Sequence, residues 1–318
     1  MNRQPLWRST PPAIFPVILG LVGLVHAWHG IGRTFGLPAA FGDILLGITV
    51  VLLAFFMLSY VAKLVKRPAV LMEDLKSPPG RAGISAISMA LIVLSAALLP
   101  FGEIARYVWW FGIILHVVIV TFVVKAISKA PPEARSATPF QLLPFVGLVT
   151  APLAGVPLGY IMLSQALTYI SLVAALVILF KLGAKFMRTR PPEPLRPPYA
   201  IILAPLSLFG MAFGMFGPEI GFTVLYFAAW GYAVLLLVFA KWLTKAGFTP
   251  MWGSFTFPAA TFTNINIMAM AKGYGVVATT GTIAGGLIAT ALIFFIAYKA
   301  LKMWMGRQLA QKTGAAVA

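Results

Sequence analysis

The stretch Ile201–Ser207, IILAPLS, decides the fold of this chain, because tracts of the same character recur at four other places. Each tract combines apolar, small and weakly polar residues, four of the five centre on a proline, and a longer, more uniformly apolar segment follows each one. The other copies are Ala13–Gly20 (AIFPVILG), Ala86–Ile92 (AISMALI), Gln141–Gly147 (QLLPFVG) and Ser254–Ala260 (SFTFPAA). This repetition predicts five helical hairpins in a membrane.

The composition excludes a soluble globular protein. Of the 318 residues, 60% are hydrophobic and only 10% are charged, and the mean hydropathy is strongly positive. A helix needs about 20 apolar residues to cross a bilayer. Hydropathy predicts ten such spans, near 12–32, 41–62, 82–100, 104–124, 139–155, 158–180, 198–215, 220–240, 250–270 and 276–298. The first span follows two arginines, as in a signal peptide, but it is also the first repeat, so we expect it to be retained.

The fold class that we predict is therefore an all-α integral membrane protein, with ten transmembrane helices arranged as five repeated hairpins around a central pore. Residues 1–318 form a single transmembrane domain, with repeats at approximately 12–62, 82–124, 139–180, 198–240 and 250–298. A single hairpin cannot bury its own apolar surface, so the repeats must pack against one another and can close into a ring.

Positive charge is concentrated on alternate loops. The net charge is +17, yet of 24 Lys and Arg only Arg33, Arg106 and Lys272 lie in the loops between the two helices of a hairpin. By the positive-inside rule, this bias predicts a multi-pass protein of the cell membrane, the inner membrane in a Gram-negative bacterium, with cytoplasmic N- and C-termini. We interpret the basic loops as a topology signal that also attracts anions, and we expect membrane lipid but no nucleic acid as a partner.

The odd-numbered segments are the predicted wall of the pore, because they hold the prolines and the small polar residues. The expected pore-lining residues are Pro16, Gly20, Ser88, Pro144, Gly147, Pro205, Ser207, Pro258 and Thr261. A proline inside a helix frees the carbonyl four residues earlier, which predicts free carbonyls at Pro12, Phe140, Ile201 and Ser254. The competing interpretation is that prolines are simply common in membrane helices.

Acidic residues are few and badly placed for a cation pathway. None of the seven falls in the middle of an odd-numbered segment, whereas a cation pathway would be expected to carry some there. Cysteine is absent, which removes disulfides, thiolate metal sites and cysteine nucleophiles.

Four motifs occur in a distinctive order: Phe15–Gly20, Ser77–Arg81 (SPPGR), Arg196–Pro205 (RPPYAIILAP) and Trp252–Pro258 (WGSFTFP). In this order, and with the ten-span layout, the chain resembles the tellurite-resistance/dicarboxylate transporter family, which includes bacterial tellurite-resistance channel-like proteins and the slow anion channels of plant guard cells. The resemblance covers almost the full length.

The resemblance implies a homotrimer in which each protomer has its own pore, lined by the five odd-numbered helices and plugged by a phenylalanine. Phe257 is the residue that matches the plug, and Phe255 is the fallback. The third helix departs from the pattern, because Met89 stands near the place where a proline would be expected. The sequence therefore does not decide whether this helix is kinked.

Three histidines are the candidates for proton coupling. His116 falls near the middle of the fourth span, while His26 and His29 can share one face of the first. A proton relay needs ionisable groups inside the membrane, but a structural role competes at each position. No cysteine or mid-membrane carboxylate completes a metal site, so we expect neither a metal nor a cofactor.

The predicted function is an anion channel, gated by Phe257, that passes small inorganic or organic anions. The alternative is a proton-coupled secondary transporter or exporter of C4-dicarboxylates, sulfite or tellurite. The scarcity of intramembrane ionisable residues favours the channel. An enzyme is not expected, because the sequence shows no constellation of nucleophile, base and metal ligands.

Overall fold

The computed structural model describes residues 5–131 and 135–318, and within this part all regular secondary structure is helical. The long helices are α1 (Phe15–Phe35), α2 (Ala40–Lys66), α4 (Pro78–Ala97), α5 (Ile104–Ser128), α8 (Ile161–Arg188), α9 (Leu203–Phe216), α10 (Glu219–Val238), α12 (Thr256–Ala271) and α13 (Gly275–Met305). The short ones are α3 (Ala69–Asp74), α6 (Leu142–Val146), α7 (Pro152–Gly155), α11 (Ala240–Leu243) and α14 (Gln308–Thr313).

Several 3-10 turns precede or interrupt these helices. Those that matter for the site are η2 (Pro12–Ile14), η5 (Pro139–Gln141), η6 (Gly147–Thr150), η8 (Pro197–Ile202) and η9 (Pro250–Phe255). Elsewhere, η1 (Leu6–Ser9), η3 (Leu99–Phe101) and η7 (Glu193–Leu195) lie in connecting segments.

Eight helices of the described residues are long and apolar enough to cross a membrane, which supports an integral membrane protein made of helices. Two of the ten predicted spans do not reach that standard. The segment Pro139–Gly155 is apolar but short, and it is divided into η5, α6, η6 and α7. The last odd-numbered segment consists of η9 and the 16-residue α12, in which Asn264 and Asn266 lower the hydropathy. The ten-span count therefore stays a prediction.

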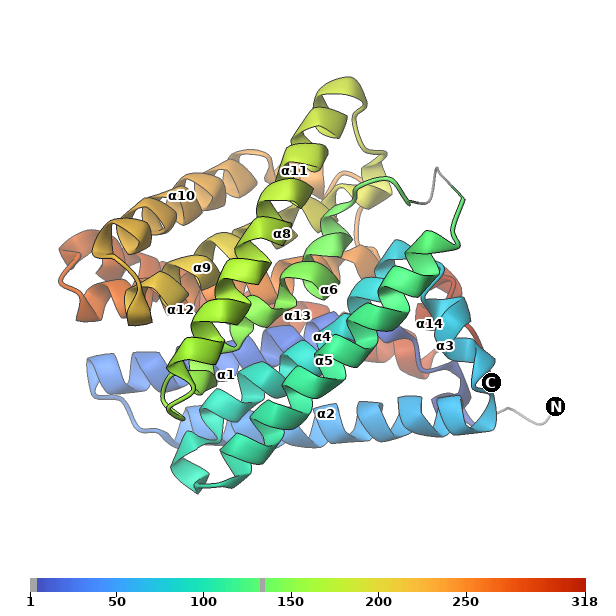
Figure 1. Ribbon diagram of the computed structural model, residues 1–318, viewed down its shortest axis with the longest axis horizontal. Coiled ribbons are helices and arrows are strands. Elements are labelled where there is room, and N and C mark those ends of the chain that lie inside the picture. Colours follow the sequence, from blue (N-terminus) through green and yellow to red (C-terminus); the bar gives the residue numbers. More distant parts are fainter. Residues whose placement is uncertain (1–4, 132–134) are drawn as a thin grey trace.

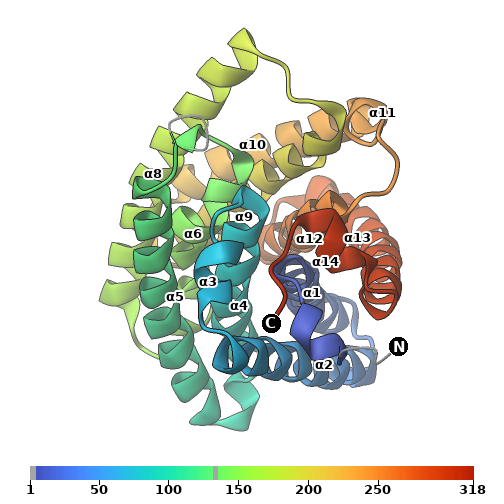
Figure 2. The ribbon, with the colours of Figure 1, turned by 90° about the vertical axis from the view of Figure 1, so that its right-hand side faces the viewer.

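Five segments form a closed inner ring, surrounded by the outer helices. Helix α1 packs against α4 and α12, α4 packs against α6 and η6, η6 packs against α9, and α9 packs against α12. The outer helices α2, α5, α8, α10 and α13 each pack on the inner segment that precedes them in the chain (Figure 2). Buried residues dominate the inner segments, whereas the outer helices expose large apolar side chains such as Ile44, Val173 and Leu237. That exposed belt suits contact with lipid.

The four repeated prolines lie in first turns of α-helix. Helices α1, α6, α9 and α12 begin one or two residues before Pro16, Pro144, Pro205 and Pro258, and a 3-10 turn directly precedes each helix. The missing N–H therefore costs little, because first-turn N–H groups have no partner within a helix. The expectation of free carbonyls is wrong at Pro12, Phe140 and Ile201, each of which accepts the N–H of the residue after the 3-10 turn.

Helix α4 begins at Pro78, earlier than the predicted start at 82, and continues without a break to Ala97. Ser77 caps it, because its Oγ accepts the N–H of Gly80 at 3.1 Å. Pro78 and Pro79 occupy the first turn, so this segment too starts with proline, and Met89 lies in uninterrupted helix.

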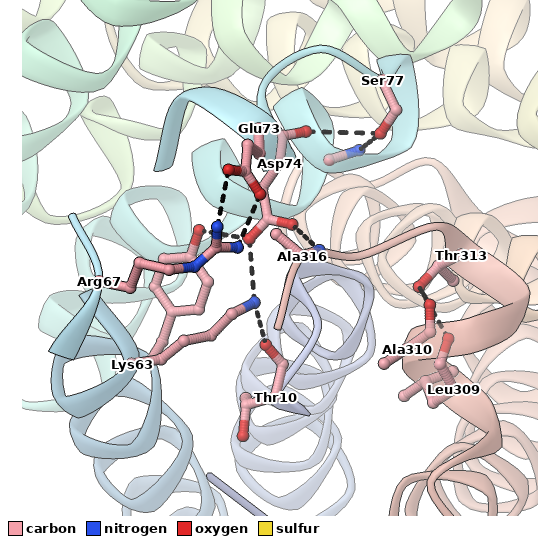
Figure 3. A network of polar contacts seen from close by, with 12 residues as sticks. Thr10, Lys63, Arg67, Glu73, Asp74, Ser77, Leu309, Ala310, Thr313 and Ala316 are labelled. Atoms are coloured by element: carbon pink, nitrogen blue, oxygen red, sulfur yellow. Dashed lines mark hydrogen bonds and ion pairs between the residues drawn. The ribbon is translucent and has the colours of Figure 1, made fainter. Parts of the chain in front are cut away.

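The described ends of the chain meet at one end of the bundle (Figure 1). The N–H of Ala318 donates to the carbonyl of Arg8 at 3.1 Å, and the N–H of Ala316 donates to Asp74 Oδ1 at 2.8 Å. Asp74 also accepts bonds from Lys63 and Tyr60, so α2, α3 and the C-terminal tail are joined by one buried polar network (Figure 3). The described ends of the chain therefore lie at the same end of the bundle (Figure 1).

Candidate functional site

A cavity lies inside the ring and is lined by all five inner segments. Its wall contains Ala13, Pro16 and Leu19; Pro79, Ala82 and Met89; Phe140, Leu142, Leu143, Val146, Gly147 and Val149; Ile201, Ala204, Pro205 and Leu208; and Pro250, Met251, Gly253, Ser254, Phe257 and Pro258. About 60 Å³ of it is open to the centres of water molecules, which is enough to admit water. The cavity covers the first half of each inner segment, at the end of the bundle where the chain termini lie.

Phe257 forms part of this wall, and Phe255 does not. Phe257 lies in the first turn of α12, only 6% of it is exposed, and its ring packs against Gly23 of α1. A Cβ on Gly23 would approach Cδ2 of Phe257 to 3.2 Å. Phe255 instead packs edge-on to Trp252, with ring centroids 5.6 Å apart, and faces the groove between α10, α12 and α13.

Four of the nine residues predicted to line a pore lie on the cavity wall, namely Pro16, Gly147, Pro205 and Pro258. The other five lie elsewhere. Gly20 faces Thr256 of α12, Ser88 faces His116 of α5, and Pro144 lines an outer groove between α5 and α8. Ser207 and Thr261 are buried, and their hydroxyls donate to the carbonyls of Leu203 and Pro258.

The buried hydroxyls mostly bond to their own helices. Besides Ser207 and Thr261, this holds for Ser85, Thr150, Thr256 and Thr263, each of which donates to a carbonyl three or four residues earlier. Those protons are not directed at the cavity, so its wall is almost entirely apolar. We expected small polar side chains on the wall, but the residues that line this cavity are mostly apolar.

Among the residues that line the cavity, Ser254 is the one with a side-chain hydroxyl, whereas the sequence analysis named it only for its backbone carbonyl. It is the only serine or threonine among the lining residues, and its hydroxyl has no hydrogen-bond partner among the residues that the structure describes. The signal was available in the spacing, because a residue three positions before Phe257 falls on nearly the same helical face. The geometry thus places one free donor next to the phenylalanine.

His116 bridges three elements at the point where the third inner segment is broken. Its Nε2 donates to the carbonyl of Pro144 at 3.0 Å, and its Nδ1 lies 2.9 Å from Ser88 Oγ. The side chain is completely buried. It therefore satisfies a carbonyl near the interruption between α6 and η6.

The other two histidines also have partners away from the cavity. His26 Nε2 donates to the carbonyl of Val93 at 2.8 Å and joins α1 to α4. His29 Nε2 lies 3.0 Å from Asp43 Oδ1 at the far end of the first hairpin. None of the three histidines is among the residues that line the cavity.

The electrostatics of the site favour an anion. Every acidic residue in the described part of the chain is paired with a base: Asp43 with His29, Glu73 with Arg67, Asp74 with Lys63, Glu103 with Arg106, Glu193 with Lys245 and Glu219 with Lys272. Glu133 lies outside the described residues. None of the paired acids lines the cavity. The first turns of α1, α4, α9 and α12 all contribute to its wall, so the positive ends of four helix dipoles lie beside it.

Comparison with known proteins identifies the family of the chain. The SLAC1 family model, described as a voltage-dependent anion channel, matches residues 9–303, which include all five inner segments and the whole cavity wall. A search of curated proteins found no match. The family predicted from the four motifs is confirmed, and its members are channels or transporters. This multi-pass helical membrane protein belongs to the SLAC1 family of voltage-dependent anion channels.

Proposed function

We propose that the chain is a passive anion channel whose pore runs through the cavity and whose gate is the ring of Phe257. The observation that carries the proposal is the position of this ring on a wall to which all five inner segments contribute. Ten spans in five hairpins, forming one domain over residues 1–318, would give each protomer its own pore. The closed sequence of contacts among the inner segments supports that arrangement.

The apolar wall and the buried ring explain why such a pore would rest in a closed state. An anion that entered would lose most of its hydration and meet few polar groups on the wall, which is costly in an apolar environment. Displacement of the Phe257 ring would widen the cavity where the ring lies beside α1 and would let water accompany the ion. Gly23, which leaves room for the ring on α1, sets where the ring rests.

Preference for anions would come from three sources. The positive ends of α1, α4, α9 and α12 lie beside the cavity, the free hydroxyl of Ser254 can donate to a passing anion, and none of the described acids lines the cavity. The basic loops would raise the local anion concentration at the mouth.

We further propose a homotrimer in the cell membrane, with cytoplasmic termini. Support comes from the meeting of the chain ends on one side and from Arg33, Arg106 and Lys272, which lie at the other end of the hairpins. The exposed apolar belt of the outer helices provides the surface for lipid and for neighbouring protomers.

Electrical recording from purified protein in a planar bilayer tests the channel. We compare the unaltered chain, Phe257→Ala and the matched control Phe255→Ala in chloride, nitrate and malate gradients. Phe257→Ala should raise the conductance at least about tenfold, which corresponds to about 1.4 kcal/mol in the barrier, while Phe255→Ala should change little. Equal conductance of all three folded proteins would reject Phe257 as the gate.

The same recordings separate a channel from a coupled carrier. For a channel, the reversal potential follows the anion gradient and does not depend on a pH gradient. Electrically silent uptake of malate, sulfite or tellurite that is driven uphill by a pH gradient would instead establish the proton-coupled transporter.

A further inference from the structure

An outer groove runs between α5, the broken third inner segment and α8, on the face that the bundle turns toward the membrane. It offers about 800 Å³ to the centres of water molecules, far more than the inner cavity. Its sides are mostly aliphatic, with Val117 and Val124 on α5 and Ile170 and Val177 on α8, all strongly exposed. An aliphatic groove of this size in contact with hydrocarbon will not stay empty.

The groove has the length of one lipid chain. Along α8 it extends from Ile170 to Lys181, which at 1.5 Å per residue is about 16 Å. Half of a 30 Å hydrocarbon core is about 15 Å. The groove therefore spans one leaflet, from the membrane surface to the bilayer centre.

One end of the groove is cationic. Lys181 and Arg135 line it there, together with Gln141. Lys181 has no hydrogen-bond or ion-pair partner among the described residues. Arg135 is held in place because its Nε and Nη2 donate to the carbonyls of Ala130 and Ser128, at 2.7 and 2.8 Å, which leaves Nη1 available. No acidic residue of the described chain lines the groove.

From this arrangement we infer that the groove is a binding site for an anionic phospholipid of the cytoplasmic leaflet. One acyl chain lies between α5 and α8, and the phosphate is held by Lys181 and Arg135. The inference rests on the proposed orientation of the termini, because that orientation places these two cations at the cytoplasmic surface. Each cation near an anionic headgroup contributes about 1 kcal/mol.

A second copy of the chain is a poorer occupant than a lipid. Every described acid is already paired with a base, so a neighbouring protomer has no free described carboxylate to offer Lys181. Its own basic loops would face the same end of the groove and repel it.

The site lies directly behind the pore wall. Pro144, Phe145 and Leu148 form the floor of the groove, while Val146, Gly147 and Val149 of the same short segment face the inner cavity. Only one broken helical segment separates the lipid from the cavity there. The lipid thus lies behind the third inner segment of the wall.

A second groove provides an internal comparison. It lies between α10, α12 and α13, offers about 390 Å³ to water centres, and has neither lysine nor arginine among its lining residues. Acyl chains can occupy it, but nothing in it selects an anionic headgroup.

Native mass spectrometry of protein extracted from vesicles of equal phosphatidylcholine and phosphatidylglycerol tests the inference. The unaltered chain should retain phosphatidylglycerol in preference, and Lys181→Ala/Arg135→Ala should weaken that retention roughly thirty-fold. The control Lys66→Ala/Lys241→Ala removes the same charge from other exposed positions and should keep the preference. Equal retention of the two lipids by the unaltered chain, or equal loss in both double variants, would refute the site.

Blocking the groove decides the occupant. Ala174→Trp should reduce bound lipid of both headgroup types while the helical circular dichroism is kept. If it leaves the lipid in place but splits the oligomer, the occupant is a neighbouring protomer and the inference is wrong. Anion currents recorded on the same samples separate the two proposals: lost lipid preference with normal current rejects only the lipid site, and absent current with retained lipid rejects only the channel.

Discussion

Lys63 Nζ lies 3.1 Å from Asp74 Oδ2, and neither side chain has any exposed surface. Lys63 also donates to the carbonyl of Thr10 at 3.0 Å, and Tyr60 donates to the same carboxylate at 2.9 Å (Figure 3). With the N–H of Ala316 on its second oxygen, Asp74 is fully engaged. This buried pair joins the N-terminal segment, α2, α3 and the C-terminal tail.

The first prediction is that breaking this pair harms stability more than replacing it. Lys63→Met leaves the Asp74 carboxylate buried without its cation and should cost about 3–5 kcal/mol. Lys63→Met/Asp74→Leu should recover most of that loss, because no charge is left unpaired. Thermal unfolding in detergent measures both. The prediction would be contradicted if the double variant lost as much free energy of unfolding as the losses of Lys63→Met and Asp74→Leu added together.

The second prediction concerns the seat of the Phe257 ring. Gly23→Ala would bring a Cβ to 2.9 Å from Ala260 Cβ and 3.2 Å from Phe257 Cδ2. Because α1 and α12 are packed tightly there, the ring should be pushed toward the cavity and the conductance should fall. In the Phe257→Ala background the same substitution should lower the bilayer current less, because only the contact with Ala260 remains. An equal fall in both backgrounds would show that Gly23 acts through helix packing alone.

The third prediction assigns a role to the free hydroxyl on the cavity wall. In the Phe257→Ala background, where current is measurable, Ser254→Ala should raise the chloride concentration for half-saturation of the conductance about tenfold, since a hydrogen bond to a charged group is worth about 1.5–3 kcal/mol. Ser254→Thr keeps the hydroxyl and serves as the control. Saturation curves that do not differ between the alanine and threonine variants would remove Ser254 from the pathway.

The fourth prediction is that His116 is structural. His116→Ala leaves the carbonyl of Pro144 without its donor inside the protein, and stability should fall by about 1–3 kcal/mol. His116→Gln, which can still donate an N–H, should lose less. Reversal potentials across a pH gradient should be unchanged in both variants. Loss of pH-driven substrate uptake in a normally folded His116→Ala protein would make the histidine a coupling group instead.

Hydropathy, repeats and motifs were sufficient to predict the class of protein, the family and the placement of most helices. Apolar runs such as those of α2 and α13 need no tertiary information, because the cost of placing charges and unpaired backbone in hydrocarbon already confines them to a membrane helix. The recurring prolines likewise mark where the inner segments begin, although we expected them within helices rather than in first turns.

Which residues face the cavity depends on the tertiary packing of the helices. Ser88, Ser207 and Thr261 looked suitable for a pore wall, yet their hydroxyls bond to carbonyls of their own helices or to His116, since a buried hydroxyl takes the nearest acceptor. The rotation of the five inner segments about their axes places Ser254 and Met89 on the cavity wall. The same rotation turns Phe257 toward the cavity and Phe255 toward the groove between α10, α12 and α13. That rotation is set by close approaches such as Gly23 against Phe257, which hydropathy does not encode.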